Sequence, residues 1–214
     1  MNALNRETWM LLGETYGFIG NSLLKPMNQT PSIGLDPAFW EDFPIVFSGE
    51  HVEGGLSNLR AYAFDAQTLG EEKAIEQAAV EYTRLFIGPP APAAAPWETM
   101  NRADGATVGF GEATFRMRRL LREAGLEVKN ENNQCEDHIG IELLYLSELC
   151  RRLAGGEGGE DAEEKIARFI DDHPLSWIEA LREKVDAEYP RGYVAGLLEL
   201  AEGVLAWQKA ALAS

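Results

Sequence analysis

The apolar residues of this chain recur with a helical period along most of its length. Near the start they lie three or four positions apart, which places them on one face of a helix of about four turns. The same spacing recurs in later segments, so the sequence predicts a chain made mainly of helices. The positions that carry this spacing are Trp9, Leu12, Tyr16, Ile19 and Leu23; Leu56, Leu59 and Tyr62; Ile75, Ala78, Ala79, Tyr82, Leu85 and Phe86; and Ile139, Leu143, Leu146, Cys150 and Leu153.

Capping signals indicate where several helices begin and end. Asp36 followed by Pro37 is typical of a helix start, because the carboxylate accepts from free backbone N–H groups and proline fits the first helical position. Gly88 and the two prolines after it predict the end of the helix that contains Phe86. Gly125 is typical of the residue just beyond a helix. Further helices are expected over residues 111–121, 161–171, 175–188 and 193–212.

Three segments lack a helical pattern and are predicted to be connections. Residues 87–101 read as a loop rich in proline and alanine, residues 130–136 as a polar loop, and residues 155–159 as a glycine-rich connector. The chain shows neither the alternation typical of strands nor a repeat of solenoid length. The sequence therefore predicts an all-α protein, a single globular bundle of about nine helices over residues 1–214.

Composition and charge narrow the range of partners. Hydrophobic residues make up 45% and charged residues 25%, as in ordinary soluble proteins, and two cysteines are too few for a disulfide framework. The formal net charge of −16 repels nucleic acid and anionic lipid and attracts basic segments, although charge alone indicates no more than solubility. Residues 1–7 lack the features of a secretory signal, and no apolar run is long enough to span a bilayer. We therefore expect a cytoplasmic protein without stable membrane insertion.

One group of reactive side chains allows an enzymatic alternative. Cys135, Asp137, His138 and Glu142 are close in sequence, and the last two are one helical turn apart. A structural zinc site usually has four ligands in two close pairs, and the sequence offers no second pair. The phosphate-binding P-loop pattern and the serine-hydrolase pattern Gly-x-Ser-x-Gly are also missing. We expect no catalytic residue, cofactor or metal, and keep a metal-dependent or acid–base enzyme at this group as the alternative.

Two segments hold residues that a purely structural role explains poorly. Trp97 ends the proline-rich loop, where a large aromatic side chain either caps the core or offers a binding surface. Asp137 is placed to cap the helix that follows, with His138 as its first residue. Gly140 then falls in the first helical turn, where glycine costs about 0.5–1 kcal/mol relative to alanine. A close approach of another backbone or side chain would account for that glycine.

Four motifs follow one another between residues 82 and 177: Tyr-x-x-Leu-Phe-x-Gly-Pro at 82–89, Pro-Trp at 96–97, Asp-His-Ile-Gly-x-Glu-Leu at 137–143, and His-x-x-x-Trp at 173–177. In this order they resemble the TorD/DmsD family of redox-enzyme maturation chaperones. The resemblance implies an all-helical cytoplasmic protein that is a monomer or a domain-swapped dimer. The peptide-binding residues that it implies are Leu85, Phe86, Gly88, Pro89, Pro96, Trp97, Asp137 and His138.

The resemblance also implies a partner. Such a chaperone binds the twin-arginine signal peptide and the immature catalytic subunit of a molybdopterin oxidoreductase, and delays export until the cofactor is inserted. Acidic side chains would receive the arginines and aromatic ones the apolar part of the peptide. A chaperone of the same fold for a non-exported molybdoenzyme subunit is the alternative within the family. We expect Trp97, Asp137 and His138 to lie together around a groove above Phe86, with the Asp137 carboxylate binding an arginine.

Overall fold

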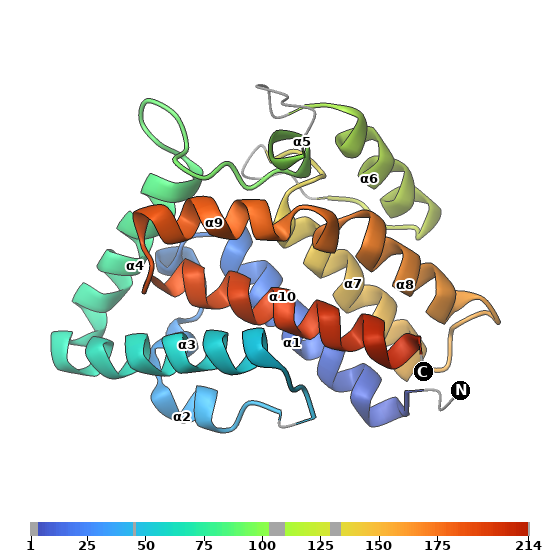
Figure 1. Ribbon diagram of the computed structural model, residues 1–214, viewed down its shortest axis with the longest axis horizontal. Helices are drawn as coiled ribbons and strands as arrows, with labels where there is room; N and C mark the ends of the chain where they lie inside the picture. Colours follow the sequence, from blue (N-terminus) through green and yellow to red (C-terminus); the bar gives the residue numbers. More distant parts are fainter. Residues whose placement is uncertain (1–3, 45, 103–109, 129–133, 214) are drawn as a thin grey trace.

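The structure, a computed structural model, describes residues 4–44, 46–102, 110–128 and 134–213. These residues form ten α-helices, two of them of only four or five residues, with three short 3₁₀ helices and no strand (Figure 1). The predicted all-α class is therefore confirmed. The elements are α1 (Arg6–Leu24), η1 (Met27–Gln29), η2 (Ser32–Leu35), α2 (Pro37–Glu41), α3 (Glu50–Leu69), α4 (Glu71–Phe86), α5 (Glu98–Asn101), α6 (Glu112–Glu123), α7 (Ile139–Ala154), α8 (Ala162–Asp172), η3 (Pro174–Ser176), α9 (Ile178–Glu188) and α10 (Tyr193–Leu212).

The core lies around α10 and α1. Helix α10 packs against α3, α8 and α9 and also contacts α1, so its residues are buried on most sides (Figure 1). The most extensive helix pair in the described residues is α1 against α7. The five positions that predicted the first helix are all buried, as a single apolar face requires.

Glycines allow α1 and α7 to approach closely. A Cβ atom added to Gly140 would lie 2.7 Å from the carbonyl oxygen of Gly20, and one added to Gly20 would lie 2.9 Å from the carbonyl oxygen of Gly140. Farther along the same contact, the Ser147 hydroxyl donates to the carbonyl of Gly13 at 2.6 Å. The close approach expected at Gly140 is confirmed, and it fixes where α7 begins relative to α1.

Several helix ends fall at the predicted residues. Asp36 caps α2, its carboxylate accepting a hydrogen bond from the N–H of Ala38 at 3.0 Å. Helix α4 ends at Phe86, and Gly88 follows with a φ of 96°, a value that favours glycine. Gly125 follows α6 with a φ of 68°. The glycine-rich connector lies between α7 and α8 as predicted.

Two stretches differ from the prediction. The last four residues of the expected loop 87–101 form α5, a helix too short to give a periodic signal. The helix expected over 175–188 is divided into η3 and α9, with Trp177 between them. Residues 130–133 of the predicted polar loop lie outside the described residues. None of the described helices combines the length and apolar character needed to cross a membrane.

Candidate functional site

The proline–tryptophan segment lies directly on the start of α7. Trp97 and His138 form an isolated antiparallel bridge. The N–H of Glu98 donates to the carbonyl of Asp137, and the N–H of Ile139 donates to the carbonyl of Pro96, both at 2.9 Å. Two motifs about forty residues apart are therefore joined through their backbones, which brings Trp97 and His138 together.

Aromatic rings surround His138. The ring centroids of Phe86 and Trp97 lie 6.2 Å and 6.3 Å from that of His138, and both contacts are edge-on. Phe86, His138 and the neighbouring Leu85 are buried, whereas Trp97 is half-buried. Trp97 is therefore the member of this group with an exposed surface.

His138 caps α7, which corrects the prediction that Asp137 does so. The Nδ1 atom of His138 accepts from the N–H of Gly140 at 3.0 Å, which leaves the ring proton on Nε2. Burial lowers the pKa of His138 to about 3, so the ring is neutral. Within the described part of the chain, the Nε2 of His138 and the Nε1 of Trp97 are buried without a hydrogen-bond partner. These two adjacent N–H groups are the free donors of the site.

Asp137 instead joins α5 and α6 to the start of α7. One carboxylate oxygen accepts from the N–H of Thr99 at 3.0 Å and from its hydroxyl at 2.6 Å. The other accepts from the hydroxyl of Thr114 at 2.9 Å. The side chain is fully buried. In this structure Asp137 positions its neighbours and is closed to an incoming guanidinium; its part in peptide binding stays a prediction.

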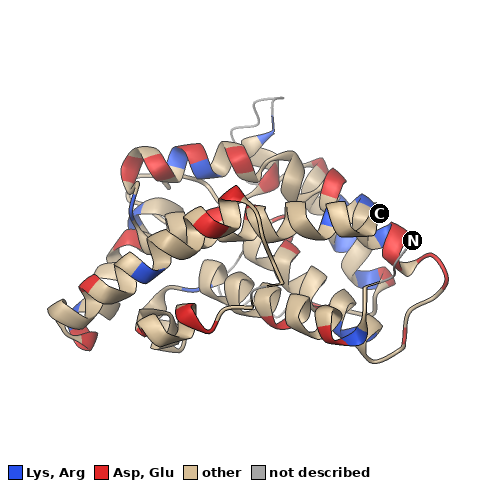
Figure 2. Ribbon diagram, turned by 60° about the horizontal axis from the view of Figure 1, so that its bottom comes forward, with Lys and Arg blue, Asp and Glu red and all other residues tan. Residues whose placement is uncertain are grey.

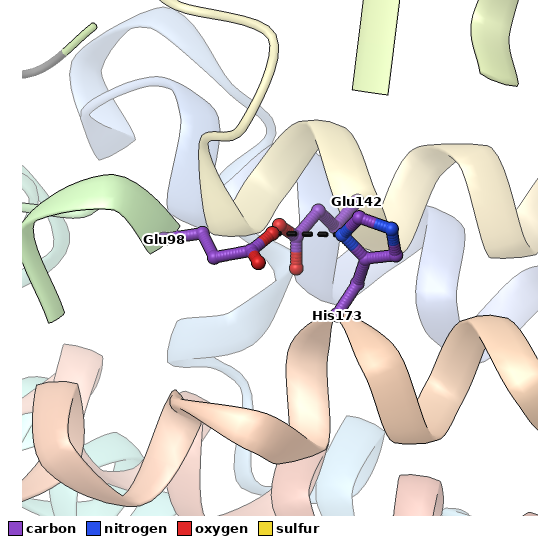
Figure 3. Close-up of side chains that lie close together, drawn as sticks. All are labelled: Glu98, Glu142 and His173. Atoms are coloured by element: carbon purple, nitrogen blue, oxygen red, sulfur yellow. Dashed lines mark hydrogen bonds and ion pairs between the residues drawn. The ribbon is translucent and has the colours of Figure 1, made fainter. Parts of the chain in front are cut away.

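A second buried cluster includes Glu98, the residue that follows Trp97. Glu98, Glu142 and His173 come from α5, α7 and the residue before η3, and their side chains point toward one another (Figure 3). The Nδ1 of His173 lies 2.8 Å from an oxygen of Glu98. Arg102 pairs with the other oxygen of Glu98, and the indole N–H of Trp177 donates to Glu142 at 3.2 Å. The cluster thus ties α5, which follows Trp97, to α7 and η3.

The two glutamates of this cluster differ in protonation: Glu142 is neutral and Glu98 is ionised. Burial and the nearby charge of Glu98 raise the pKa of Glu142 well above its usual value, so Glu142 is a neutral acid. Burial alone would raise the pKa of Glu98. The hydrogen bond from His173 and the charge of Arg102 outweigh that effect and lower the pKa below its usual value, so Glu98 is ionised. One atom from each of the three side chains lies within 4.8 Å of the others, an arrangement that could ligate a metal ion. Glu98 is contacted by His173 and Arg102, whereas the Oε1 atom of Glu142 is buried without a hydrogen-bond partner among the described residues.

The enzymatic alternative gains little from these positions. Glu142 belongs to the cluster with Glu98, while Asp137 and His138 are held by hydrogen bonds to other partners. Burial, together with the charges of Asp137 and Glu136, raises the pKa of the Cys135 thiol. A protonated thiol is a poor nucleophile and a poor metal ligand at neutral pH.

An open groove runs along the outer side of α4. Its volume is about 700 Å³, and two of the predicted site residues, Gly88 and Pro89, form one end. The groove walls combine carboxylates with apolar side chains. The remaining lining residues are Asn28, Glu72, Ile75, Glu76, Ala79, Val80, Thr83 and Arg84.

Sequence reasoning missed Glu72, Glu76 and Val80. Acidic side chains occur on helices throughout the molecule, so no single pair is conspicuous (Figure 2). Val80 was the available signal, because it is apolar yet falls outside the periodic positions of this helix; the structure leaves it 58% exposed. The loop that follows α4 returns to this helix, with N–H groups of Ala93 and Ala94 donating to carbonyls near its end, and then continues to Trp97.

Comparisons with known proteins agree on one family. The family described as "Nitrate reductase delta subunit" matches residues 49–183. Over 108 residues the chain is 34% identical to the Tat proofreading chaperone DmsD of Salmonella typhimurium, covering 47% of this chain and 49% of the relative. It is 27% identical over 111 residues to the chaperone protein TorD of Vibrio cholerae, covering 50% and 49%. A TorD of Shewanella amazonensis matches at 22% over 196 residues, covering 83% and 78%. The matches to the first two relatives span about half of their length.

Proposed function

The chain belongs to the nitrate reductase delta subunit family, and from that premise we propose that it is a non-catalytic chaperone for the maturation of a molybdopterin oxidoreductase. Its relatives carry the names Tat proofreading chaperone and chaperone protein. The proposed ligand is the twin-arginine signal peptide of the immature catalytic subunit. The proposed place of action is the cytoplasm, before export.

The groove on α4 is the observation that carries this proposal. A twin-arginine signal peptide has two adjacent cations followed by an apolar stretch. Glu72 and Glu76 are exposed and one helical turn apart, so their carboxylates can receive neighbouring guanidinium groups. Ile75 and Val80 supply an apolar wall beside them. The groove therefore offers both parts of the required chemistry within one volume.

Trp97, at the other end of the loop, offers the peptide a second surface. Its half-buried ring can cover apolar side chains of a peptide, as tryptophan does at many interfaces. The unpartnered N–H groups of Trp97 and His138 could donate to backbone carbonyls if the peptide displaces the atoms that now cover them. Phe86 meets the His138 ring edge-on, and both Phe86 and Leu85 are buried, so neither needs to contact the peptide.

The electrostatic part of the binding should be modest and sensitive to salt. An exposed ion pair contributes about 0–1 kcal/mol, so two pairs change affinity by up to roughly tenfold to thirtyfold. Screening shortens the reach of exposed charges as ionic strength rises. Affinity for the peptide should therefore fall from low to high salt and then level off at the apolar contribution.

Calorimetric titration of a synthetic twin-arginine signal peptide tests the proposal. Changing Glu72 and Glu76 together to Gln should weaken binding several-fold. The matched control changes Glu179 and Glu183 on α9 to Gln, since these are also exposed and one turn apart. Both variants lose two negative charges, so equal losses would mean that only overall charge attracts the peptide. No loss in the α4 variant would refute the groove as the arginine site.

A second peptide distinguishes a chaperone for an exported subunit from one for a non-exported subunit. The family description names nitrate reductase, which leaves open a client subunit that is not exported. Replacing both arginines of the signal peptide by glutamine should weaken binding by up to roughly tenfold to thirtyfold if the twin-arginine signal is recognised. Equal binding of both peptides would favour an assembly chaperone for a non-exported subunit.

A further inference from the structure

Helix α6 carries basic side chains in an acidic protein. Arg116, Arg118, Arg119 and Arg122 lie within two turns of it, although the whole chain has only 19 lysines and arginines against 35 acids. Arg116 pairs with Glu112, and Arg118 pairs with Glu136. Among the residues that the structure describes, Arg119 and Arg122 form no salt bridge and both are exposed. Both guanidinium groups are accessible to a partner, and the charge of Arg122 also helps to lower the pKa of Glu136.

Two phenylalanines lie on the same outward side of α6. Phe110 and Phe115 are 48% and 54% exposed, and their rings meet edge-on with centroids 5.0 Å apart. The opposite side of the helix, with Met117 and Leu121, is buried. Folding gains little from two phenylalanines that remain half exposed, so their place on the surface points to contact with another molecule.

Arg118 holds the two rings in place. Its guanidinium carbon lies 5.7 Å from the ring centroid of Phe110 and 5.8 Å from that of Phe115. The same guanidinium donates to both carboxylate oxygens of Glu136, at 2.6 and 3.0 Å. This bidentate pair fixes the side chain, so the aromatic pair is organised before any partner arrives.

We propose that this basic aromatic face, made of Phe110, Phe115, Arg118, Arg119 and Arg122, binds an acidic protein segment that carries an apolar residue. The segment belongs to the client subunit outside its signal peptide, an assignment that rests on the proposed function. A basic signal peptide is repelled by this face, whereas an acidic segment is matched by Arg119 and Arg122 in charge and by the rings in shape.

The overall charge of the chain favours this occupant over a membrane. An anionic bilayer is an extended surface and meets the field of the whole molecule, whose formal charge is −16. A short segment responds mainly to charges within a Debye length of about 8 Å, and on α6 the described cations outside salt bridges are Arg119 and Arg122. Local attraction can thus operate on a protein that repels large anions.

Fluorescence anisotropy with a labelled synthetic peptide tests the face. The probe contains acidic residues around a central leucine and phenylalanine. Changing Arg119 and Arg122 to Ser should weaken its binding about fivefold to tenfold. The matched control changes the exposed Arg6 and Arg191 to Ser, which removes the same charge elsewhere and should leave affinity unchanged.

A second pair of variants tests the aromatic part. Phe115→Ser should weaken binding several-fold, whereas Phe64→Ser on α3, where the ring is 66% exposed, should not. Circular dichroism should show the same helix content in all variants, since every substituted side chain is exposed. No binding of the probe by the unmodified protein, or equal losses in matched variants, would overturn the proposal. Binding to phosphatidylserine vesicles without binding to the probe would also overturn it, in favour of a lipid surface.

The signal peptide provides the separate readout. Its affinity should be unchanged or slightly improved in the α6 variants, because they remove positive charge far from the proposed groove. A protein that binds the acidic probe but not the signal peptide would refute the proposed function and leave this face standing. The reverse result would refute the face alone.

Discussion

Replacing Asp137 by asparagine should destabilise the fold by about 2 kcal/mol. The carboxylate accepts three hydrogen bonds, two from Thr99 and one from Thr114, and is fully buried. Asparagine keeps one acceptor oxygen, which can serve Thr99, and turns its NH₂ group toward the Thr114 hydroxyl. One hydrogen bond to a charged acceptor is then lost, at a cost of about 1.5–3 kcal/mol. The helix-cap role that the sequence predicts for Asp137 would give a smaller loss of stability, because asparagine also caps helices well.

Thermal unfolding followed by circular dichroism measures this cost. For a chain of this size, 2 kcal/mol corresponds to a fall in Tm of roughly 4–8 °C. Asp36→Asn is the matched control, since Asp36 caps α2 at an exposed position where asparagine caps equally well, and its Tm should hardly change. If Asp137→Asn also melts within about 1 °C of the unmodified protein, the buried network does not hold α5 and α6 as described.

Three further predictions concern packing and buried acids. Gly140→Ala should lower the free energy of unfolding in urea by about 1–2 kcal/mol, because the clash of a Cβ 2.7 Å from the carbonyl of Gly20 outweighs the gain in helix propensity. A stabilised variant would contradict this contact. Burial raises the pKa of Glu81 to about 7 from 4.5, so its ionisation weakens the fold as pH rises between those values. Glu81→Gln should make the free energy of unfolding less dependent on pH in that range, and an unaltered slope would show that Glu81 ionises freely. Glu142→Gln should lower the free energy of unfolding by under about 1 kcal/mol, because Glu142 is already neutral. Glu98→Gln should lower it by about 2–3 kcal/mol, because it removes a buried charge from its partners. Guanidinium unfolding measures both, and the reverse order would argue for a bound cation.

Helix positions could be predicted from the sequence because burial imposes a period. Trp9, Leu12 and Tyr16 are three and four residues apart since each must face the core from one side of α1. The close approach at Gly140 was also predictable, because glycine in a first helical turn has a local cost that only a tertiary contact offsets. In both cases a few neighbouring residues are enough to show the pattern, even though the contact that explains Gly140 is with the distant Gly20.

The start of α7 could not be placed to the residue by local reasoning. Aspartate and histidine can both cap a helix, and local preference favours aspartate at position 137. The choice is made by tertiary contacts, since the bridge between Trp97 and His138 turns the Asp137 side chain toward Thr99 and Thr114. These partners lie 38 and 23 residues away in the sequence. No pattern near Asp137 indicates them.

The groove was missed for a different reason. In a chain with 35 acids, Glu72 and Glu76 look like part of a solvated helix face, and their significance comes from the apolar wall beside them. The opposite edge of the groove depends on how η1 packs against α4, which brings Asn28 there. Helical periodicity describes which side of α4 is buried, but not what stands opposite its exposed side.

Buried residues at this site can affect peptide binding without touching the peptide. Trp97 is held by backbone hydrogen bonds to α7, and Asp137 and Glu98 anchor the segments on either side of that joint. Any change at Asp137 or His138 will therefore move Trp97, so a loss of affinity in such a variant cannot separate contact from position. Exposed groove residues lack this ambiguity, because Glu72→Gln and Glu76→Gln alter charge at the surface and leave the core packing intact. The peptide titration with the α4 and α9 variants is for that reason the measurement that locates the binding surface.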